Sequence, residues 1–260
     1  GIQQSGGTGL TVTGCKIHEG YGTGIYSRNS TKITLTDNEI YVMSNSSSGV
    51  DADGIGIVSG QSTDGTYTNG TLIEGNNIHD NHTDGIKIHG EYIIVRNNQV
   101  LDNIYTDWAA IHPDGIQLVA SVVDGFTSTA HVKGLGNVFR NHTQEIFMEG
   151  TLSGESSDCE DTTVANNVVY RAGTVNGVDT STLSGTAINV KFVNGAYIYN
   201  NTIGTIYADG IRVQDSKNGT VFIKNNINQQ TTGTGYNIQT TADMAAGSFD
   251  YNQCLVSGNC

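Results

Sequence analysis

Residues 76–88 have the sequence NNIHDNHTDGIKI, which contains two short patterns and the step between them. The first pattern, Asn-x-Ile, covers residues 76–78, and the second, Asp-Gly-Ile, covers residues 84–86. After the second pattern, isoleucine alternates with lysine, as in a strand that buries one face and exposes the other. Both patterns recur along the chain, so this stretch is one unit of an internal repeat.

The asparagine that opens the first pattern, which we call the Asn mark, occupies one fixed position in each repeat. Asparagine tolerates the left-handed conformation of tight corners, and its side-chain amide can bond the same residue of the next repeat. Successive marks are separated by 22 to 39 residues, which indicates units that share strands but differ in their loops. The marks are Asn38, Asn76, Asn98, Asn137, Asn167, Asn201, Asn225 and Asn252, and Cys15 takes the same place in the first unit.

The second pattern follows the Asn marks and ends in an isoleucine that opens another alternating segment. A third strand is expected just before each Asn mark, as at residues 32–35 and 92–95. The second pattern is found at residues 24–25, 53–55, 84–86, 114–116, 145–146, 187–188 and 209–211. In three units the two patterns are eight residues apart, measured from Ile17 to Ile25, from Ile78 to Ile86 and from Ile203 to Ile211.

Three short strands per unit and about nine units predict an all-β fold, a single-stranded right-handed parallel β-helix. No composition break or proline-rich linker divides the chain, so we expect one domain over residues 1–260. No segment keeps a 3.6-residue period with caps, which excludes helical repeats. An antiparallel sandwich is the second choice, but it does not explain one ordered pair of patterns in every unit.

The chain is acidic, with 12 Lys and Arg residues against 25 Asp and Glu and a net charge of −13. This charge argues against binding to nucleic acid, because contacts with phosphate need a basic stripe. It also argues against an anionic membrane surface, and no apolar run approaches the roughly 20 residues of a membrane helix. The four cysteines are compatible with an oxidising compartment.

Aligning the units on the second pattern brings chemically active side chains into columns. Consecutive coils of a β-helix stack about 4.8 Å apart. Lys87 and Gln117 then form an outward column. The same alignment predicts a column of His82, His112 and His142 beside a column of Asp84, Asp114 and Gln144, with Asp51 and Asp53 one coil earlier.

Stacked carboxylates repel one another, so the acidic column is expected either to shift its pKa values or to bind a cation. Carboxylate oxygens suit Ca²⁺ as ligands. The competing interpretation is structural, because Asp-Gly is good turn chemistry and recurs at Asp209, far from any histidine. The candidate ligands for Ca²⁺ are Asp51, Asp53, Asp84 and Asp114.

Insertions lengthen particular coils at two corners, and solenoids build binding walls in this way. The longer segments are residues 42–50, 104–111 and 173–183 at one corner, and 60–70, 120–133 and 149–161 at the other. Aromatic residues on such walls can stack on sugar rings, although loop packing explains them equally well. The candidates for substrate binding are Tyr67, Tyr105, Trp108 and Phe126, together with Gln117 and Arg140.

The segment NIHDNHTDGI at residues 77–86 resembles a coil of the pectate-lyase-like superfamily, notably of mannuronan C5-epimerases and related alginate lyases. The segment HPDGIQ at residues 112–117 is similar to other polysaccharide-active β-helix proteins. The resemblance extends over nearly all of the chain and implies a β-helix that acts on a polysaccharide. The epimerase signature Tyr-Gly-x-Asp-Pro-His does not occur, so the resemblance transfers no catalytic residue.

Three functions are compatible with these residues. A polysaccharide lyase needs a base at C5 of a uronate, for which His112 or His82 is available, and a cation for the uronate carboxylate, such as Lys87, Arg140 or Ca²⁺. An inverting glycoside hydrolase would instead use the aspartate column. A non-catalytic adhesin, filament or tail-fibre segment needs neither. We favour the lyase, with His82, Asp84, Lys87, His112, Asp114 and His142 as the candidate catalytic residues.

The expected partner is therefore a polysaccharide, and the expected location is extracellular or at the cell surface. Unpaired strand edges at open coil ends recruit further strands. We accordingly expect either a monomer or a homo-oligomer formed end to end or side by side. No cofactor other than Ca²⁺ is expected.

Overall fold

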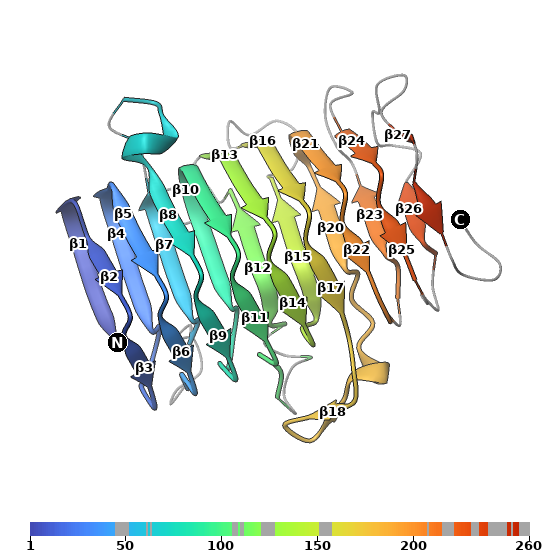
Figure 1. Cartoon of the computed structure of the whole chain (residues 1–260), viewed down its shortest axis with the longest axis horizontal. Helices are drawn as coiled ribbons and strands as arrows, with labels where there is room; N and C mark the ends of the chain where they lie inside the picture. The colour runs from blue at the N-terminus through green and yellow to red at the C-terminus, as the bar shows by residue number, and fades with distance from the viewer. Residues whose placement is uncertain are drawn as a thin grey trace.

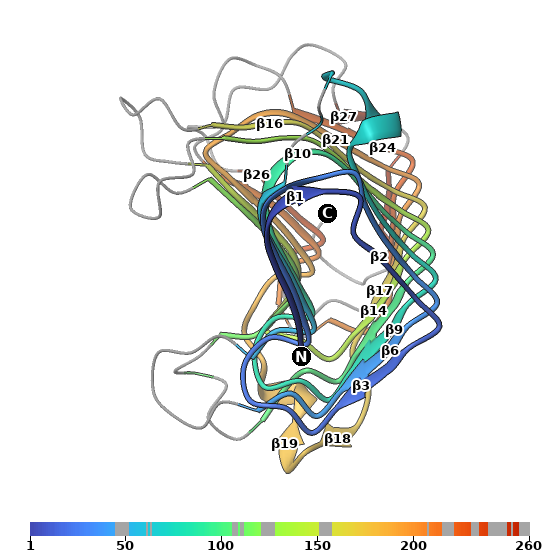
Figure 2. The ribbon, with the colours of Figure 1, turned by 90° about the vertical axis from the view of Figure 1, so that its left-hand side faces the viewer.

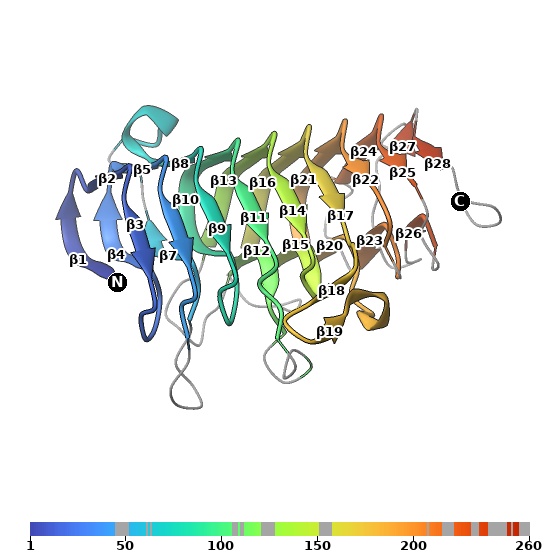
Figure 3. The same ribbon diagram turned by 60° about the horizontal axis from the view of Figure 1, so that its bottom comes forward.

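The computed structural model describes residues 1–44, 52–60, 62, 64–105, 109, 112–120, 128–150, 158–206, 208–214, 221–229, 234–238, 249–250 and 252–254. Almost every strand pairs in parallel with the equivalent strands of the coils before and after it, and one sheet contains nine strands. The chain is therefore a parallel β-helix, with nine coils in the residues that the structure describes, as the repeat predicts (Figures 1 and 3).

Each coil contributes one strand to each of three faces, which we call sheets A, B and C. Sheet A contains β1 (Ile2–Thr8), β4 (Ile25–Thr31), β7 (Ile55–Gly60), the first part of β10 (Ile86–Arg96), β12 (Asp114–Val119), β15 (Gln144–Glu149), β20 (Ile188–Lys191), β23 (Ile211–Gln214) and β26 (Tyr236–Ile238). Sheet B contains β2 (Thr11–Thr13), β5 (Ile33–Thr36), β8 (Thr71–Glu74), the second part of β10, β13 (Ser128–Leu135), β16 (Asp158–Ala165), β21 (Val193–Tyr199), β24 (Val221–Lys224) and β27 (Phe249–Asp250). Sheet C contains β3 (Lys16–His18), β6 (Glu39–Tyr41), β9 (Asn77–His79), β11 (Gln99–Leu101), β14 (Val138–Arg140), β17 (Val168–Tyr170), β22 (Thr202–Ile203), β25 (Ile227–Asn228) and β28 (Gln253–Cys254).

Longer excursions leave the coil at its corners. The hairpin of β18 (Thr174–Val175) and β19 (Val178–Asp179), followed by the 3₁₀ turn η2 (Thr180–Thr182), lies between sheets C and A. Another 3₁₀ turn, η1 (Tyr67–Asn69), lies between sheets A and B. Figure 2, which looks along the coil axis, shows the hairpin projecting from one corner and η1 from another. None of the helical turns in the described residues is long and apolar enough to cross a membrane.

The hydrophobic core fills the inside of the coil along its whole length. In many strands the buried residues alternate with more exposed ones, as in β23, where Ile211 and Val213 are buried and Arg212 and Gln214 are not. Because the strands pair in register, like residues stack on like residues. One inward column of sheet A runs through Ile25, Ile55, Ile86, Ile116, Ile146, Ile188 and Ile211.

A buried ladder of asparagine side chains joins the coils at the corner between sheets B and C. The main-chain N–H of Asn137 and its Nδ2 both donate to Oδ1 of Asn167, at 2.8 and 3.1 Å. Nδ2 of Asn137 also donates to the main-chain oxygen of Val95, at 2.9 Å. The predicted amide stacking is therefore confirmed. The ladder consists of Asn38, Asn76, Asn98, Asn137, Asn167, Asn201, Asn226 and Asn252.

Two details of the asparagine prediction are wrong. In the eighth coil the ladder residue is Asn226, not Asn225, so the inward position of β25 is taken by the buried Asn228 rather than by an isoleucine. The left-handed residue of each corner is the one before the ladder asparagine, as at Asn166, with φ of 58°, and at Asn225, with φ of 55°. The ladder asparagine needs its side chain inside the coil, and the preceding residue makes the turn.

The ladder predicts a large loss of stability in Asn167→Ala. This change removes the acceptor of two Asn137 donors and the donor to the main-chain oxygen of Gly134, all of them buried or partly buried. Each buried polar group left without a partner costs about 1–3 kcal/mol, so we expect the free energy of unfolding in urea to fall by roughly 3 kcal/mol or more. The exposed neighbour offers the control: Asn166→Gly keeps the left-handed turn and should change stability little. Equal losses in the two variants would contradict a structural ladder.

Candidate functional site

The outer face of sheet A carries the first group of predicted residues. Lys87 on β10 pairs in register with Gln117 on β12, and both are partly exposed. The predicted outward column of these two residues is therefore present, and Phe147 on β15 extends it. Figure 2 shows the superimposed sheet A strands as one side of the coil.

His112 stands at the entrance to β12 with its imidazole 49% exposed. Its Nδ1 lies 3.4 Å from Oδ1 of Asp114, whose side chain is fully buried. The backbone of His112 is left-handed, with φ of 51°. Other non-glycine residues at the corners of the coil, such as Asp80 and Asp102, have the same conformation, so it marks His112 as a corner residue. A buried carboxylate thus holds an exposed imidazole in place.

The aspartates of the second pattern form a continuous column in three coils. Oδ1 of Asp53 accepts a hydrogen bond from Oγ1 of Thr83 at 2.5 Å and another from the main-chain N–H of Asp84 at 3.2 Å. Oδ1 of Asp84 accepts one from the main-chain N–H of Asp114 at 2.7 Å. Asp209 accepts one in the same way from the main-chain N–H of Thr234, at 2.9 Å. Each carboxylate therefore ties its coil to the next, which gives the column a structural role as well.

The stacking and burial of these carboxylates change their acidity. Burial raises the pKa of Asp84 well above its ordinary value, and the neighbouring Asp114 and Asp53 raise it further. Burial also raises the pKa of Asp114, against the opposing effect of His112. The neighbouring carboxylate of Asp114 raises the pKa of His112. The predicted perturbation of the acidic column is present, and Asp84 is the carboxyl group most strongly driven towards its neutral form.

Lys87 and Gln117 complete this group of side chains. Nε2 of Gln117 donates to Oδ2 of Asp114 at 3.3 Å. The positive charge of Lys87 acts on Asp84, where it partly opposes the rise of the pKa. The sheet thus brings together His112, Asp114, Asp84, Lys87 and Gln117, which were all predicted for the site.

His82 and His112 occupy equivalent positions in consecutive coils. Ile86 of β10 pairs with Ile116 of β12, and each histidine precedes its isoleucine by four residues. The His82 ring packs on Tyr105, with 5.3 Å between ring centroids. The hydroxyl of Tyr105 donates to the main-chain oxygen of Asp80 at 2.7 Å. Both residues therefore lie at the corner between sheets C and A.

The prediction that His142 lies in an outward column is wrong. Its side chain is completely buried, whereas that of His112 is half exposed. The spacing of the two patterns explains why His142 is buried. The hydrophobic residues of the two patterns are seven residues apart in the coil of His142, from Phe139 to Ile146, but eight apart in the coil of His82, from Ile78 to Ile86. Alignment on the second pattern therefore shifts the corner of this coil by one residue. In register with sheet C, His142 takes the interior place that Asn103 takes one coil earlier.

His142 belongs to a buried charged cluster that sequence reasoning missed. Its Nδ1 lies 2.5 Å from Oε2 of Glu145, and Nε of Arg171 lies 3.4 Å from Oε1 of Glu145. The side chains of all three residues are completely buried. Glu145 occupies the position of the glycine in the second pattern, so a signal was present in the sequence. Arg171 also donates to the main-chain oxygens of Leu183, Thr143 and Gly185, at 2.6–2.8 Å.

Two further predicted residues lie on other faces of the coil. Arg140 is on β14 in sheet C and forms an ion pair with Asp102. Tyr67, in η1, packs edge-on against Tyr92 and beneath the ammonium group of Lys133, both from sheet B. Tyr67 thus lies at the corner between sheets A and B, whereas His112 lies at the corner between sheets C and A. Trp108, Phe126 and Asp51 lie outside the described residues.

The prediction of a Ca²⁺ site receives no support from the described part of the aspartate column. Asp53 and Asp84 use their Oδ1 atoms to accept main-chain N–H groups. Among the residues that the structure describes, no group of three or more His, Cys, Asp and Glu side chains could hold a metal ion. Asp51, the remaining candidate ligand, is not among them. We therefore derive no chemistry from Ca²⁺.

The contact between His112 and Asp114 predicts that the pKa of His112 depends on the Asp114 carboxylate. In Asp114→Asn the carboxylate that stabilises the imidazolium is lost, so the pKa of His112 should fall, as followed by NMR titration of its ring protons. Asp102→Asn removes a carboxylate from sheet C and is the matched control. A pKa of His112 that is the same in wild type and Asp114→Asn would rule out the proposed pairing.

The buried cluster predicts that Arg171→Ala is strongly destabilising. Removing the guanidinium group leaves Glu145 uncompensated in the interior, and breaking a buried pair typically costs about 3–5 kcal/mol. Arg140→Ala breaks a partly exposed pair and should cost no more than about 1 kcal/mol. Chemical denaturation of both variants checks the contrast, which fails if Arg171→Ala is as stable as Arg140→Ala.

Comparisons with known proteins agree with this architecture. The tailspike protein of E. coli bacteriophage HK620, determined in complex with a pentasaccharide, has a similar fold with a TM-score of 0.56 and 10% identity, over 97% of this chain and 41% of the tailspike. A mutant of that tailspike, also with pentasaccharide, gives a TM-score of 0.55 and 11% identity, over 97% and 40% of the two chains.

The chain thus spans about two fifths of the length of these tailspikes, and at this identity the likeness concerns the fold. No curated protein sequence matches the chain. Residues 1–167 match the family described as the right handed beta helix region. The chain belongs to the right-handed β-helix family.

Proposed function

We propose that the outer face of sheet A around His112 binds a polysaccharide and cleaves it by β-elimination at a uronate. The observation that carries the proposal is the half-exposed imidazole of His112, held by the buried Asp114 in the coil next to Lys87. Similar tailspikes bind a pentasaccharide, which supports a glycan as the ligand of a β-helix face. Such a substrate implies work outside the cell or at its surface.

His112 is suited to be the base of this reaction. Its Nδ1 faces Asp114, so Nε2 is the nitrogen left to accept the proton from C5 of the uronate. The electrons of the C–H bond form the C4–C5 double bond, the C4–O bond breaks, and the leaving oxygen takes a proton from solvent. Asp114 stabilises the imidazolium that results, as a buried carboxylate does for other catalytic histidines.

Lys87 and Gln117 supply groups for the uronate carboxylate. Removal of the C5 proton becomes easier when the carboxylate beside it is neutralised or hydrogen-bonded. Lys87 is a cation, and Gln117 adds an amide donor in the adjacent coil.

The column of carboxyl groups favours hydrolysis as a second candidate. A carboxyl group with a raised pKa is the usual general acid of a glycosidase, and Asp84 fits that requirement. The partner carboxylate would have to activate water, yet Asp114 is fully buried and already contacts His112 and Gln117. This arrangement therefore supports the lyase better. Non-catalytic glycan binding remains the third candidate.

The decisive prediction concerns His112→Ala. With polygalacturonate, alginate and hyaluronan as substrates, the wild-type protein should produce unsaturated uronate that absorbs near 235 nm, and the variant should lose roughly a hundredfold or more in rate. The rate should rise with pH through the raised pKa of His112, because only the neutral ring accepts a proton. His18→Ala is the matched control, since its side chain is 43% exposed but on sheet C.

Each other outcome identifies a different function. New reducing ends without absorbance would mean hydrolysis and would reject elimination. Binding without turnover of any glycan would mean a non-catalytic protein. Full activity of His112→Ala would show that the reaction takes place elsewhere on the chain.

A further inference from the structure

The outer face of sheet B carries a second cluster of side chains, near the C-terminal end of the coil. Tyr197 and Tyr199 alternate with buried residues along β21, so both point outwards, and each is 37% exposed. In the next coil they pair with Phe222 and Lys224 of β24. In the coil before, the smaller Thr163 and Ala165 take these positions, so the tyrosines rise above them.

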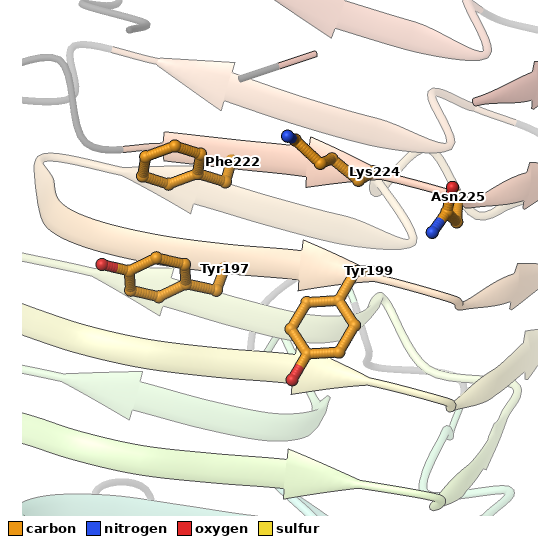
Figure 4. Close-up of a pocket in the computed structure, with 5 residues that line it drawn as sticks. All are labelled: Tyr197, Tyr199, Phe222, Lys224 and Asn225. Atoms are coloured by element: carbon orange, nitrogen blue, oxygen red, sulfur yellow. The ribbon is translucent and has the colours of Figure 1, made fainter. Parts of the chain in front are cut away.

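These side chains enclose a hollow with an aromatic floor. The rings of Tyr197 and Phe222 are stacked, with centroids 5.2 Å apart and planes within 2° of parallel. Figure 4 shows Tyr199 beside this stack and Lys224 beside Phe222, with Asn225 next along the chain. The five residues line a space of about 260 Å³. The space lies on sheet B, whereas His112 belongs to sheet A.

The exposed rings are not explained by packing. A β-helix needs its inward column for stability, and its outward positions need no aromatic ring: those of β5 hold threonine, and those of β8 hold Leu72 and Glu74. Large apolar side chains with this exposure are few among the described residues: Tyr21, Val42, Val168, Tyr197, Tyr199 and Phe249. Two of them are adjacent outward residues of one strand, which indicates a ligand-binding surface.

We propose that this hollow binds a hexopyranose ring of a neutral glycan. A pyranose presents a face of C–H groups and a rim of hydroxyls, and the hollow offers the complementary set. The rings of Tyr197, Tyr199 and Phe222 provide apolar contact, in the manner of other aromatic contacts in proteins. The four lining residues other than Phe222 carry the polar groups: the hydroxyls of the two tyrosines, the ammonium group of Lys224 and the amide of Asn225 can bond to sugar hydroxyls at the edge.

The size of the hollow selects this ligand over a protein. A stable protein interface uses about 20–30 residues from each partner, whereas five residues line this space. One or two sugar rings fill a shallow space of this size. Charge gives no reason for an acidic sugar, because Lys224 pairs in register with Asp250 and the chain as a whole carries −13.

This site is separate from the proposed active site. It lies on a different sheet and two to three coils further along, which corresponds to about 10–15 Å along the axis. It therefore serves to hold the protein on a glycan rather than to take part in bond cleavage. The inference does not depend on the proposed elimination reaction, and the two are tested with different variants and different probes.

The test uses the full chain and four neutral hexasaccharide probes, namely a β-1,4-glucan, an α-1,4-glucan, a β-1,4-mannan and a β-1,4-galactan. Saturation-transfer difference NMR should show binding of at least one probe to the wild-type protein. Tyr199→Ala and Phe222→Ala should each weaken it tenfold or more. Tyr21→Ala removes a tyrosine that is 77% exposed at another site and should leave binding unchanged.

Two further measurements separate binding from folding and from the reaction at sheet A. Thermal unfolding should show that Tyr199→Gln, which keeps most of the side-chain volume, is as stable as wild type while it still loses binding. His112→Ala should bind the neutral probe normally, and Tyr199→Ala should keep the elimination rate on short uronates. The proposal is overturned if none of the four probes binds, if binding persists in both aromatic variants, or if these variants instead change the oligomeric state.

Discussion

The structure depends on the need of a buried amide for hydrogen-bond partners. Each ladder asparagine is inside the coil, where a donor or acceptor left alone costs about 1–3 kcal/mol. The side chain is satisfied only if the next coil places an asparagine at the same corner, as Asn137 and Asn167 do. This requirement fixes the register of all nine coils, while the other corners are free to carry loops of different lengths.

A fixed register has a chemical consequence, because equivalent residues of successive coils must stack. At the Asp-Gly step it places Asp53, Asp84 and Asp114 in one buried column, where their charges repel. The hydrogen bonds from main-chain N–H groups keep the column in place, while burial and the neighbouring carboxylates raise the pKa of Asp84. Two residues before Asp114, the imidazole of His112 lies beside the Asp114 carboxylate and is half exposed to solvent. The aspartate column that ties the coils together thus also lies against the imidazole of His112.

Sequence reasoning was strong wherever an interaction repeats and weak where a coil departs from the repeat. The fold, the amide stacking and the proximity of Lys87, Gln117 and Asp114 follow from spacing alone. His142 was misplaced because one corner is a residue shorter. Asn225 was predicted as the ladder residue in place of the adjacent Asn226. Arg140 and Tyr67 were assigned to the site without knowledge of which face each corner serves. Tyr197 and Tyr199 alternate in the sequence, so their outward position was predictable, but only the structure shows Phe222 beside them.

The corner that departs from the repeat, between β14 and β15, lies one coil before the hairpin of β18 and β19. A second, shorter asparagine ladder runs along the corner between sheets C and A, where the main-chain N–H of Asn81 donates to Oδ1 of Asn103 at 2.8 Å. In the next coil His142 takes this place, and its partner Glu145 draws Arg171 into the interior. Arg171 then binds the main-chain oxygens of residues 183 and 185, where the segment that carries β18 and β19 returns to sheet A. The interior charges therefore replace the amide ladder one coil before the corner that carries the hairpin. A β-helix can change one wall of its surface in this way without disturbing the ladder on the opposite corner.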